Sequence, residues 1–209
     1  MNTSRRQTHW QNVYQTKGEE TVSWFQESPE ISLDLIRTTG IDADGSIVDI
    51  GGGASRLVDS LLDAGFCNVT VLDLSESALE ASKIRLGARN ARVNWVVADI
   101  TAWQPPQSYD VWHDRAAFHF LTDPDDQATY AECIQNAVKR GGHVIIGTFA
   151  LDGPERCSGL PVVRHDADSL GQMLGNSFDL IESRSHDHLT PGGTVQKFQF
   201  SHFQRRQLG

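Results

Sequence analysis

The 209-residue sequence has few cysteines and no long hydrophobic run. Its three cysteines, Cys67, Cys133 and Cys157, are odd in number and scattered, which argues against a disulfide framework and a zinc site and indicates free thiols in a reducing compartment. No apolar run approaches the roughly 20 residues of a membrane span. The first ten residues, MNTSRRQTHW, lack the apolar core of a signal peptide. We therefore expect a cytoplasmic protein that makes no membrane contact.

Positive charge is also scarce. Lysine and arginine together number 18 against 27 acidic residues, which gives a formal net charge of -9. Proteins that bind nucleic acid are more often basic, so this composition disfavours a nucleic-acid partner. The length suits one α/β domain and leaves no room for a second domain that would bind a large acceptor. A small-molecule partner is therefore expected, with the chain acting as a monomer or a homodimer.

Short apolar segments alternate with amphipathic ones from residue 46 onward. The expected strands are residues 46–50, 68–75, 92–100, 109–115, 142–150, 178–189 and 194–203, and the expected helices are residues 8–17, 29–40, 54–65, 75–87, 126–142 and 166–175. Alternation through five strands predicts a parallel sheet with helices on both faces. The turn TPGG joins the last two strands as an antiparallel hairpin. The result is a seven-stranded, mostly parallel α/β sheet with one reversed strand.

The segment SIVDIGGGASRL places three glycines directly after the first strand. Glycine allows a sharp turn and the close approach of a ligand to the backbone. A dinucleotide fingerprint needs glycine at the sixth position, where this sequence has Arg56, and a Walker loop needs a Gly-Lys-Ser/Thr ending that is absent. Asp49, two residues before Gly51, would repel a pyrophosphate. The turn is therefore expected to bind a nucleotide-like ligand that carries a positive charge nearby.

Two more acids stand at the ends of the next two strands. Asp73 lies about 20 residues after the glycines, where a carboxylate can hold two ribose hydroxyls. Asp99 ends the third strand and can accept a hydrogen bond from an adenine amine, with Ile100 covering the ring. A single acid at such a position is more often a helix cap. Three acids at consecutive strand ends favour a ligand, because open α/β sheets bind ligands at the carboxyl ends of their strands.

These motifs and the reversed last strand resemble the class I methyltransferases that depend on S-adenosylmethionine. The resemblance covers roughly residues 45 to 205 and implies a Rossmann-like fold with S-adenosylmethionine as cofactor. It implies that the methionine part is held by Asp49 with Gly51, Gly52 and Gly53. It also implies that Asp73, beside Leu74, holds the ribose and that Asp99 with Ile100 holds the adenine. The sequence departs from many members at Ser55, which stands in place of a third glycine. Residues 1–40 are expected to form a helical lid on a core of residues 41–209.

The fourth strand ends in a cluster of polar side chains, on the side where the acceptor should bind. The segment DVWHDRAAFHFL contains His113, Asp114, Arg115 and His119, and is similar to a segment of thiopurine S-methyltransferase-like members. We expect Arg115 to hold a thiolate and His119 or Asp114 to accept a proton. Asp114 and Arg115 could instead fix the loop, and His119 could be a core residue.

Aromatic, histidine and cysteine residues elsewhere are secondary candidates. Trp24 is expected to contact the cofactor as part of an aromatic lid formed by Trp10, Tyr14, Trp24 and Phe25. The hairpin at residues 186–190 could bring His186, His188 and Thr190 toward the acceptor. No third ligand accompanies the two histidines, so no metal site is expected. Cys157 follows a Pro-Glu-Arg turn and could be a substrate-loop residue, although a spectator thiol is the favoured expectation.

The sequence thus predicts a small-molecule methyltransferase that uses S-adenosylmethionine. The favoured acceptor is a thiol, hydrogen sulfide, methanethiol or a selenium analogue. Protein lysine methylation, or another N- or O-methylation, is an alternative. The leading aromatic segments of this sequence resemble those of the lysine methyltransferases of translation factors. Those enzymes commonly carry an Asn/Asp-Pro-Pro-aromatic loop after the fourth strand, where this sequence reads HDRAAF. A regulatory module that binds the cofactor without turnover is a third possibility.

Overall fold

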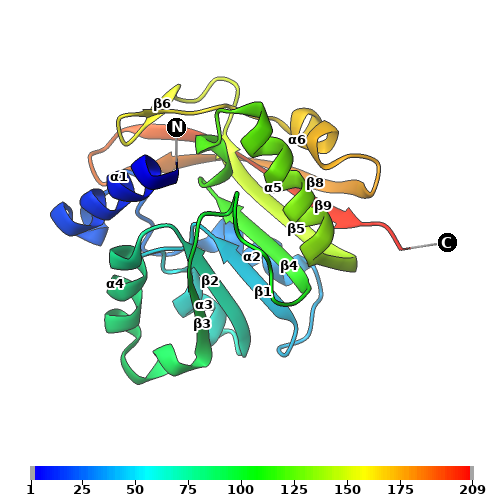
Figure 1. The fold of residues 1–209 in the computed structure, drawn as a ribbon, viewed down its shortest axis with the longest axis horizontal. Coiled ribbons are helices and arrows are strands. Elements are labelled where there is room, and N and C mark those ends of the chain that lie inside the picture. The colour runs from blue at the N-terminus through cyan, green and yellow to red at the C-terminus, as the bar shows by residue number, and fades with distance from the viewer. Residues whose placement is uncertain (1–2, 208–209) are drawn as a thin grey trace.

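The computed structural model of the chain describes residues 3–207, which form a twisted sheet covered by helices on both faces (Figure 1). The strands of the main sheet are β1 (Ser46–Ile50), β2 (Asn68–Asp73), β3 (Val93–Val97), β4 (Tyr109–Arg115), β5 (Val138–Phe149), β8 (Phe178–Leu189) and β9 (Val195–Arg205). The helices are α1 (Thr3–Thr16), α2 (Glu30–Thr38), α3 (Leu57–Asp63), α4 (Glu76–Leu86), α5 (Pro124–Ala137) and α6 (Ala167–Leu174), with short 3-10 turns η1 (Glu19–Thr21), η2 (Gly87–Arg92) and η3 (Phe118–Phe120).

The seven strands lie in the order β3-β2-β1-β4-β5-β9-β8. Strands β1 to β5 pair in parallel, whereas β9 pairs antiparallel with both β5 and β8. The predicted mostly parallel sheet is therefore confirmed, with β9 as the reversed strand and β8 running in the same direction as the others. The chain turns from β1 toward β2 on one side and later adds β4 on the other, so a crevice opens at the carboxyl ends of β1 and β4.

Alternating side chains on the strands create two separate cores. Ile47, Val69 and Val71 belong to one buried cluster with apolar residues of α2, α3 and α4. Val48 and Trp112 belong to a second cluster with apolar residues of α5 and α6. Successive residues of a strand point to opposite faces, and each face of the sheet thus receives its own layer of helices.

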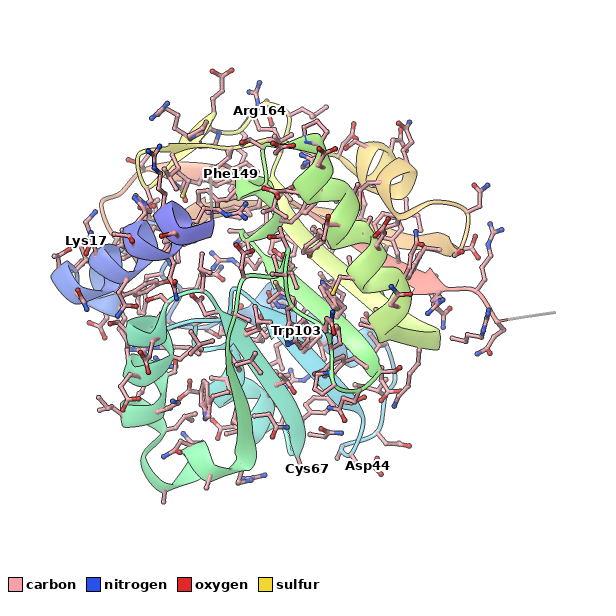
Figure 2. All side chains as sticks on the ribbon, in the orientation of Figure 1. Lys17, Asp44, Cys67, Trp103, Phe149 and Arg164 are labelled. Carbon is pink, nitrogen blue, oxygen red and sulfur yellow. The ribbon has the colours of Figure 1, made fainter. Side chains whose placement is uncertain are left out.

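The link between β3 and β4 has no helix and is anchored by a tryptophan. Trp103 lies in this link (Figure 2), and its ring centroid is 6.2 Å from that of Tyr109 and 6.3 Å from that of Trp112. Aromatic packing therefore fills the place that a crossover helix would otherwise cover.

Some predicted boundaries were wrong. The helix expected over residues 126–142 begins at Pro124, after Asp123 as N-cap, and ends at Ala137. Val138 already pairs with Tyr109 as the first residue of β5, because its buried, β-branched side chain packs in the sheet core. The third strand ends at Val97, before Asp99.

An additional two-stranded hairpin follows β5. It consists of β6 (Arg156–Cys157) and β7 (Leu160–Pro161), a segment for which no strand was expected. The two residues of its turn, Ser158 and Gly159, both have positive φ, as a type I′ hairpin turn requires. In Figure 1 the hairpin lies across the end of the sheet, on the same side as α1.

The segment expected to be a lid divides into two parts. Helix α2 packs in the core through its own residues Leu35 and Ile36, which are fully buried. Helix α1 instead lies against α4 near the carboxyl ends of the strands (Figure 1). Only the part before α2 therefore lies where a lid would. Within residues 3–207, no helix is long and apolar enough to cross a membrane.

Candidate active site

The glycine turn fits tightly between two strand ends. The N–H groups of Gly51 and Gly52 both donate to the carbonyl of Leu72, at 2.8 and 3.2 Å. Gly51 has a φ of 68°, and a Cβ atom there would lie 2.5 Å from the Cβ of Ala117 in the turn after β4. A side chain at this position is excluded by both conformation and space. The turn therefore brings bare backbone to the edge of the sheet.

The other two glycines pack against the carboxylates of the predicted site. A Cβ atom on Gly52 would lie 2.4 Å from Oδ2 of Asp49, and one on Gly53 would lie 2.6 Å from Oδ2 of Asp73. Two of the three sequence-predicted acids thus meet at the glycine turn. Their carboxylates lie against backbone that has no side chain to shield it from a ligand.

A cavity runs along the carboxyl edge of the sheet, past the glycine turn. At one end its lining comes from β2 and the segment after β3, and at the other from the ends of β4, β5 and β9. The lining residues are Arg6, Trp10, Tyr14, Trp24, Ile50, Gly51, Leu72, Asp73, Leu74, Ala98, Asp99, Ile100, Arg115, Ala116, Ala117, Phe120, Leu121, Phe149, Cys157, Gln196 and Phe198. The predicted cofactor residues Gly51, Asp73, Leu74, Asp99, Ile100 and Trp24 all line it, and so does Arg115.

Asp73 is a buried carboxylate with spare hydrogen-bonding capacity. Its Oδ1 accepts from the N–H of Ser75 at 2.7 Å, while burial, reinforced by the neighbouring charge of Asp49, raises the pKa of Asp73 to about 7. Hydroxyl groups that donate to this carboxylate would stabilise its ionised form. A ribose supplies two such hydroxyls, so the site fits the role predicted for Asp73.

Asp99 forms an ion pair with an arginine of helix α1. Arg6 of α1 places Nη2 at 2.9 Å from Oδ2 of Asp99 and Nη1 at 2.6 Å from Oδ2 of Asp126 at the start of α5. Thr101 donates to Oδ1 of Asp99 through both its N–H and its hydroxyl. The acid predicted to hold an adenine amine therefore also ties α1 to the sheet.

Asp49 and His113 form a buried pair beside the glycine turn. Nδ1 of His113 lies 2.7 Å from Oδ1 of Asp49, and both side chains are almost fully buried. A small second cavity contacts both residues together with Gly52, Ser32 and Arg115. Nε2 of His113 and the hydroxyl of Ser32 are buried there without a hydrogen-bond partner. The carboxylate of Asp49 and the guanidinium of Arg115 thus both border this cavity, which suits the oppositely charged amino and carboxylate groups at the amino-acid end of the expected cofactor.

Arg115 lies between the two cavities and contributes to both. Its Nη1 donates to the carbonyl of Trp24 at 2.9 Å, and its guanidinium lies 5.2 Å from the ring centroid of Phe198. Nε and Nη2 are shielded from solvent and have no partner. Burial lowers the pKa of Arg115 to about 10, so the group remains a cation at neutral pH with two free donors. Such donors are suited to an anionic group.

Asp114, predicted as a proton acceptor, holds the turn after β4 instead of lining the cavity. Its carboxylate accepts from the N–H groups of Ala117 and Phe118 and, at 2.7 Å, from the hydroxyl of Tyr130. Burial raises its pKa to about 6, against the effect of these hydrogen bonds. The adjacent Ala116 has a φ of 66°, a strained value for alanine, and lines the cavity. Asp114 thus fixes the strained turn beside Arg115.

His119 is buried among aromatic rings and is not part of the cavity lining. Its centroid lies 4.5 Å from that of Phe120 and 4.8 Å from that of Phe149, and neither ring nitrogen has a partner. Burial, with smaller effects from His165 and Arg115, lowers its pKa to about 3. The imidazole of His119 is therefore neutral. The two rings that it contacts, Phe120 and Phe149, line the cavity, whereas His119 does not.

The outer wall of the cavity is largely aromatic. Trp10 packs edge-on against Trp24 at 5.7 Å and against Phe120 at 4.8 Å, and Trp24 donates its indole N–H to the hydroxyl of Tyr14 at 3.1 Å. Phe25 faces elsewhere, with the guanidinium of Arg56 5.1 Å from its ring. Trp10, Tyr14 and Trp24 thus line the cavity as predicted for the lid, and Phe25 does not.

The histidines of the β8–β9 hairpin anchor the segment that follows α1. Nε2 of His188 lies 2.8 Å from the carbonyl oxygen of Ser23. Nε2 of His186 lies 3.5 Å from Nε2 of the Gln26 side chain. Thr190 closes its own turn by accepting from the N–H of Thr194. Among residues 3–207, no cluster of three or more ligand-type side chains that could hold a metal occurs.

Sequence reasoning missed several residues that complete the cavity. Phe149 ends β5 at the upper edge of the sheet (Figure 2), and Phe198 pairs with it from β9. Gln196 and Cys157 also line the cavity, although Cys157 was expected to be a spectator. One signal was available for Gln196: it shares a strand face with Phe198 and Phe200, so a polar residue directly precedes two aromatic residues on that face. Arg6 had no local signal, because its partners are distant in sequence.

Comparison with known proteins agrees with this geometry. Residues 47–142 match the family model of the methyltransferase domain. The ubiquinone biosynthesis O-methyltransferase of Ralstonia nicotianae is 31% identical over 127 residues, which are 60% of this chain and 52% of that protein. The eEF1A lysine and N-terminal methyltransferase of Bos taurus is 25% identical over 57% of this chain and 17% of its own length. The chain thus spans about half, or less, of these two relatives.

Solved structures share the whole fold. A SAM-dependent methyltransferase from Anabaena variabilis superimposes with a TM-score of 0.77 at 12% identity, over 99% of this chain and 96% of that one. The N-methyltransferase NodS from Bradyrhizobium japonicum, solved with S-adenosyl-L-homocysteine, gives 0.73 at 16% identity over 99% and 100%. The chain therefore shares the fold of these S-adenosylmethionine-dependent methyltransferases, and residues 47–142 match a methyltransferase domain.

Proposed function

We propose that this protein transfers the methyl group of S-adenosylmethionine to the sulfur of a small thiol. Hydrogen sulfide, methanethiol and their selenium analogues belong to the same chemical class of acceptor. The observation that carries this proposal is the Arg115 guanidinium, which lines both the small cavity and the larger cavity with aromatic walls and has two donor nitrogens, Nε and Nη2, without a partner.

The cofactor would be held by the half of the cavity that contains β1, β2 and the segment after β3. Asp73 would accept from the ribose hydroxyls, and Asp99 with Ile100 would border the adenine. Asp49, His113 and Ser32 would meet the amino-acid end in the small cavity beside the glycine turn. When bound, S-adenosylmethionine supplies an electrophilic methyl carbon and leaves as S-adenosylhomocysteine, whose sulfur keeps the electron pair of the broken bond.

The acceptor would be held by the other half, between Arg115, Phe149 and Phe198. Aromatic walls exclude water, and a nucleophile that has shed its water is more reactive in direct displacement. Arg115 would favour the anionic form of an acceptor over its neutral form by direct N–H donation. The thiol proton passes to solvent, and the thiolate forms the new bond to the methyl carbon.

The titratable groups near the acceptor half support a thiol over harder nucleophiles. His119 is a weak base because burial lowers its pKa, and the carboxylate of Asp114 is occupied by two backbone N–H groups and Tyr130. A thiol ionises near pH 8.5 and therefore needs little help from a base, whereas a phenol or an alcohol needs much more. A site with a cation but without a well-placed base is thus suited to a thiolate.

Methylation of an amine, including a protein lysine, is the second candidate. The eEF1A methyltransferases among the relatives carry lysine in their names, and the similarity of the Bos taurus protein to this chain extends over 121 residues. A protonated amine would, however, meet the positive charge of Arg115 in the acceptor half. The electrostatics of the cavity therefore favour the thiol.

A panel of acceptors matched in size tests the proposal. The enzyme is incubated with S-adenosylmethionine and either 1-propanethiol, propylamine or 1-propanol, and S-adenosylhomocysteine is measured together with headspace sulfides. We expect turnover with the thiol and release of methyl propyl sulfide. Turnover with the amine or the alcohol but not with any thiol would overturn the proposal. Methyl label in lysate proteins without thiol turnover would favour the lysine alternative.

A further inference from the structure

Gln196 lines the cavity with a side-chain amide whose oxygen has no hydrogen-bond partner. It is the second residue of β9, its side chain is 8% exposed, and it lines the cavity beside Phe198. Its Oε1 is shielded from solvent and has no hydrogen-bond partner. An amide oxygen removed from water without a partner is destabilising, and such atoms are rare in folded proteins. An atom of this kind in a cavity wall indicates a ligand that donates to it.

The place of β9 in the sheet assigns this atom to the acceptor. The acids of the cavity wall, Asp73 and Asp99, belong to β2 and to the segment after β3, whereas β9 lies on the other side of β1, β4 and β5. On the cavity-facing side of β9, Gln196 is followed by Phe198, which contacts the guanidinium of Arg115. The cavity wall of β9 therefore combines a hydrogen-bond acceptor at Gln196 with an aromatic ring that holds a cation.

We propose that Gln196 selects the acceptor by accepting a hydrogen bond from it. The acceptor would be a small thiol that carries an O–H or N–H donor near its sulfur, with the sulfur directed to Arg115 and the donor to Oε1 of Gln196. This inference rests on the proposed function and narrows its substrate class. A cavity built to pair with a donor rejects an analogue that lacks it, because the amide oxygen is then left unpaired.

Two acceptors of almost equal size separate the hydrogen bond from simple fit. The hydroxyl of 2-mercaptoethanol occupies the place of the terminal methyl group of 1-propanethiol. We expect the full-length enzyme to prefer 2-mercaptoethanol in kcat/KM by roughly three- to tenfold, the range of one neutral hydrogen bond. Gln196→Met keeps the length of the side chain and removes the oxygen. We expect this variant to have about equal kcat/KM for the two thiols, because only the turnover of 2-mercaptoethanol falls.

The melting temperature of the Gln196→Met variant distinguishes a role of Gln196 in ligand binding from a role in stability. If Oε1 of Gln196 has no partner in the free protein, Gln196→Met leaves the melting temperature unchanged or raises it. Gln199→Met is the matched control, because Gln199 is on the same strand but faces away from the cavity and bonds to the carbonyl of Phe200. The control should keep the acceptor preference of the native enzyme.

The possible failures are distinguishable. Thiol turnover with an unchanged preference in Gln196→Met overturns the inference about Gln196 and leaves thiol methylation standing. A lower melting temperature with equal losses for both acceptors overturns it as well, because it assigns Gln196 a structural role. The absence of turnover with either thiol overturns the proposed function itself, and this inference with it.

Discussion

The Nη2 atom of Arg6 lies 2.9 Å from Oδ2 of Asp99, which links α1 to the segment after β3 that lines the cavity. The same guanidinium reaches Asp126 at the start of α5. Both Arg6 and Asp99 are largely buried, so their charges depend on each other for compensation. One cation of α1 thus holds two acids of the core, and Asp99 is one of the residues that line the cavity.

Replacing Arg6 should loosen this link. Arg6→Gln removes the charge that compensates Asp99, and we expect a loss of about 1–3 kcal/mol in the free energy of unfolding. We also expect faster proteolysis near α1 and weaker binding of S-adenosylhomocysteine. Arg5→Gln is the control, since Arg5 is an exposed neighbour on the same helix. Equal proteolysis and affinity in the two variants would contradict the coupling.

Cofactor affinity should depend on pH through Asp73. Its pKa in the folded protein is about 7, so the carboxyl is largely protonated below that pH. Ribose hydroxyls donate best to the ionised form, and affinity should therefore rise with pH up to about 7, by at most about tenfold per pH unit. Calorimetric titration with S-adenosylhomocysteine between about pH 5.5 and 8 measures this slope. Asp73→Asn should bind weakly at every pH, and an identical slope in that variant would exclude Asp73 as its origin.

The same shift has the opposite sign for stability. The pKa of Asp73 is raised above the usual aspartate value of 3.8, so between about pH 4 and 7 the folded state binds more protons than the unfolded state. The contribution of Asp73 to the free energy of unfolding therefore falls as pH rises through this window. The melting temperature of Asp73→Asn, relative to the native protein, should increase from pH 5 to pH 8. A difference that is constant with pH would contradict this assignment.

Loss of Arg115 should slow thiol methylation and change its pH profile. Arg115→Met removes the cation that favours the thiolate, and we expect kcat/KM to fall about 10- to 100-fold, the value of one charged hydrogen bond. The remaining activity should keep rising toward pH 8.5, where a free thiol ionises. Arg56→Met is the control, because Arg56 also lies over a phenylalanine but outside the main cavity. Weaker binding of S-adenosylhomocysteine with an unchanged pH profile would assign Arg115 to the cofactor instead.

Asp114 should matter for stability more than for chemistry. Asp114→Asn weakens three hydrogen bonds that hold the turn after β4, with an expected loss of about 1–3 kcal/mol. Tyr130→Phe removes one of these bonds and also takes away the hydroxyl that accepts from the indole N–H of Trp112 at 3.1 Å, so we expect a loss of similar size. Urea unfolding measures both losses, and the kinetics of the folded variants show whether the chemical step is affected. A large fall in kcat for Asp114→Asn at native stability would restore the catalytic role predicted from the sequence.

The parts of the site that depend on local pattern could be predicted from the sequence. The glycine turn and the acids at strand ends are local features, and the parallel sheet necessarily brings them to one edge. Asp73 and Gly51 therefore line the cavity as expected. The acceptor half could not be predicted in the same way. Cys157, Phe149 and Gln196 come from a hairpin, a strand end and a reversed strand that meet only through tertiary packing.

Burial also reversed expectations for individual polar residues. His113, Asp114 and His119 formed one conspicuous cluster in the sequence, yet strand alternation and the turn send them to different surroundings. His113 pairs with Asp49, Asp114 with backbone N–H groups, and His119 lies among aromatic rings. Spacing along the chain shows that polar residues are close together but does not show which of them face a shared cavity.

Transfer of a labelled methyl group tests the central claim most directly. S-adenosylmethionine carrying 13C in its methyl group is incubated with the native protein and 2-mercaptoethanol, and the reaction is followed by 13C NMR. We expect the signal of the sulfonium methyl to disappear while that of a thioether methyl appears in equal amount. A methyl signal on nitrogen or oxygen in a competing mixture with ethanolamine, without any thioether signal, would contradict it.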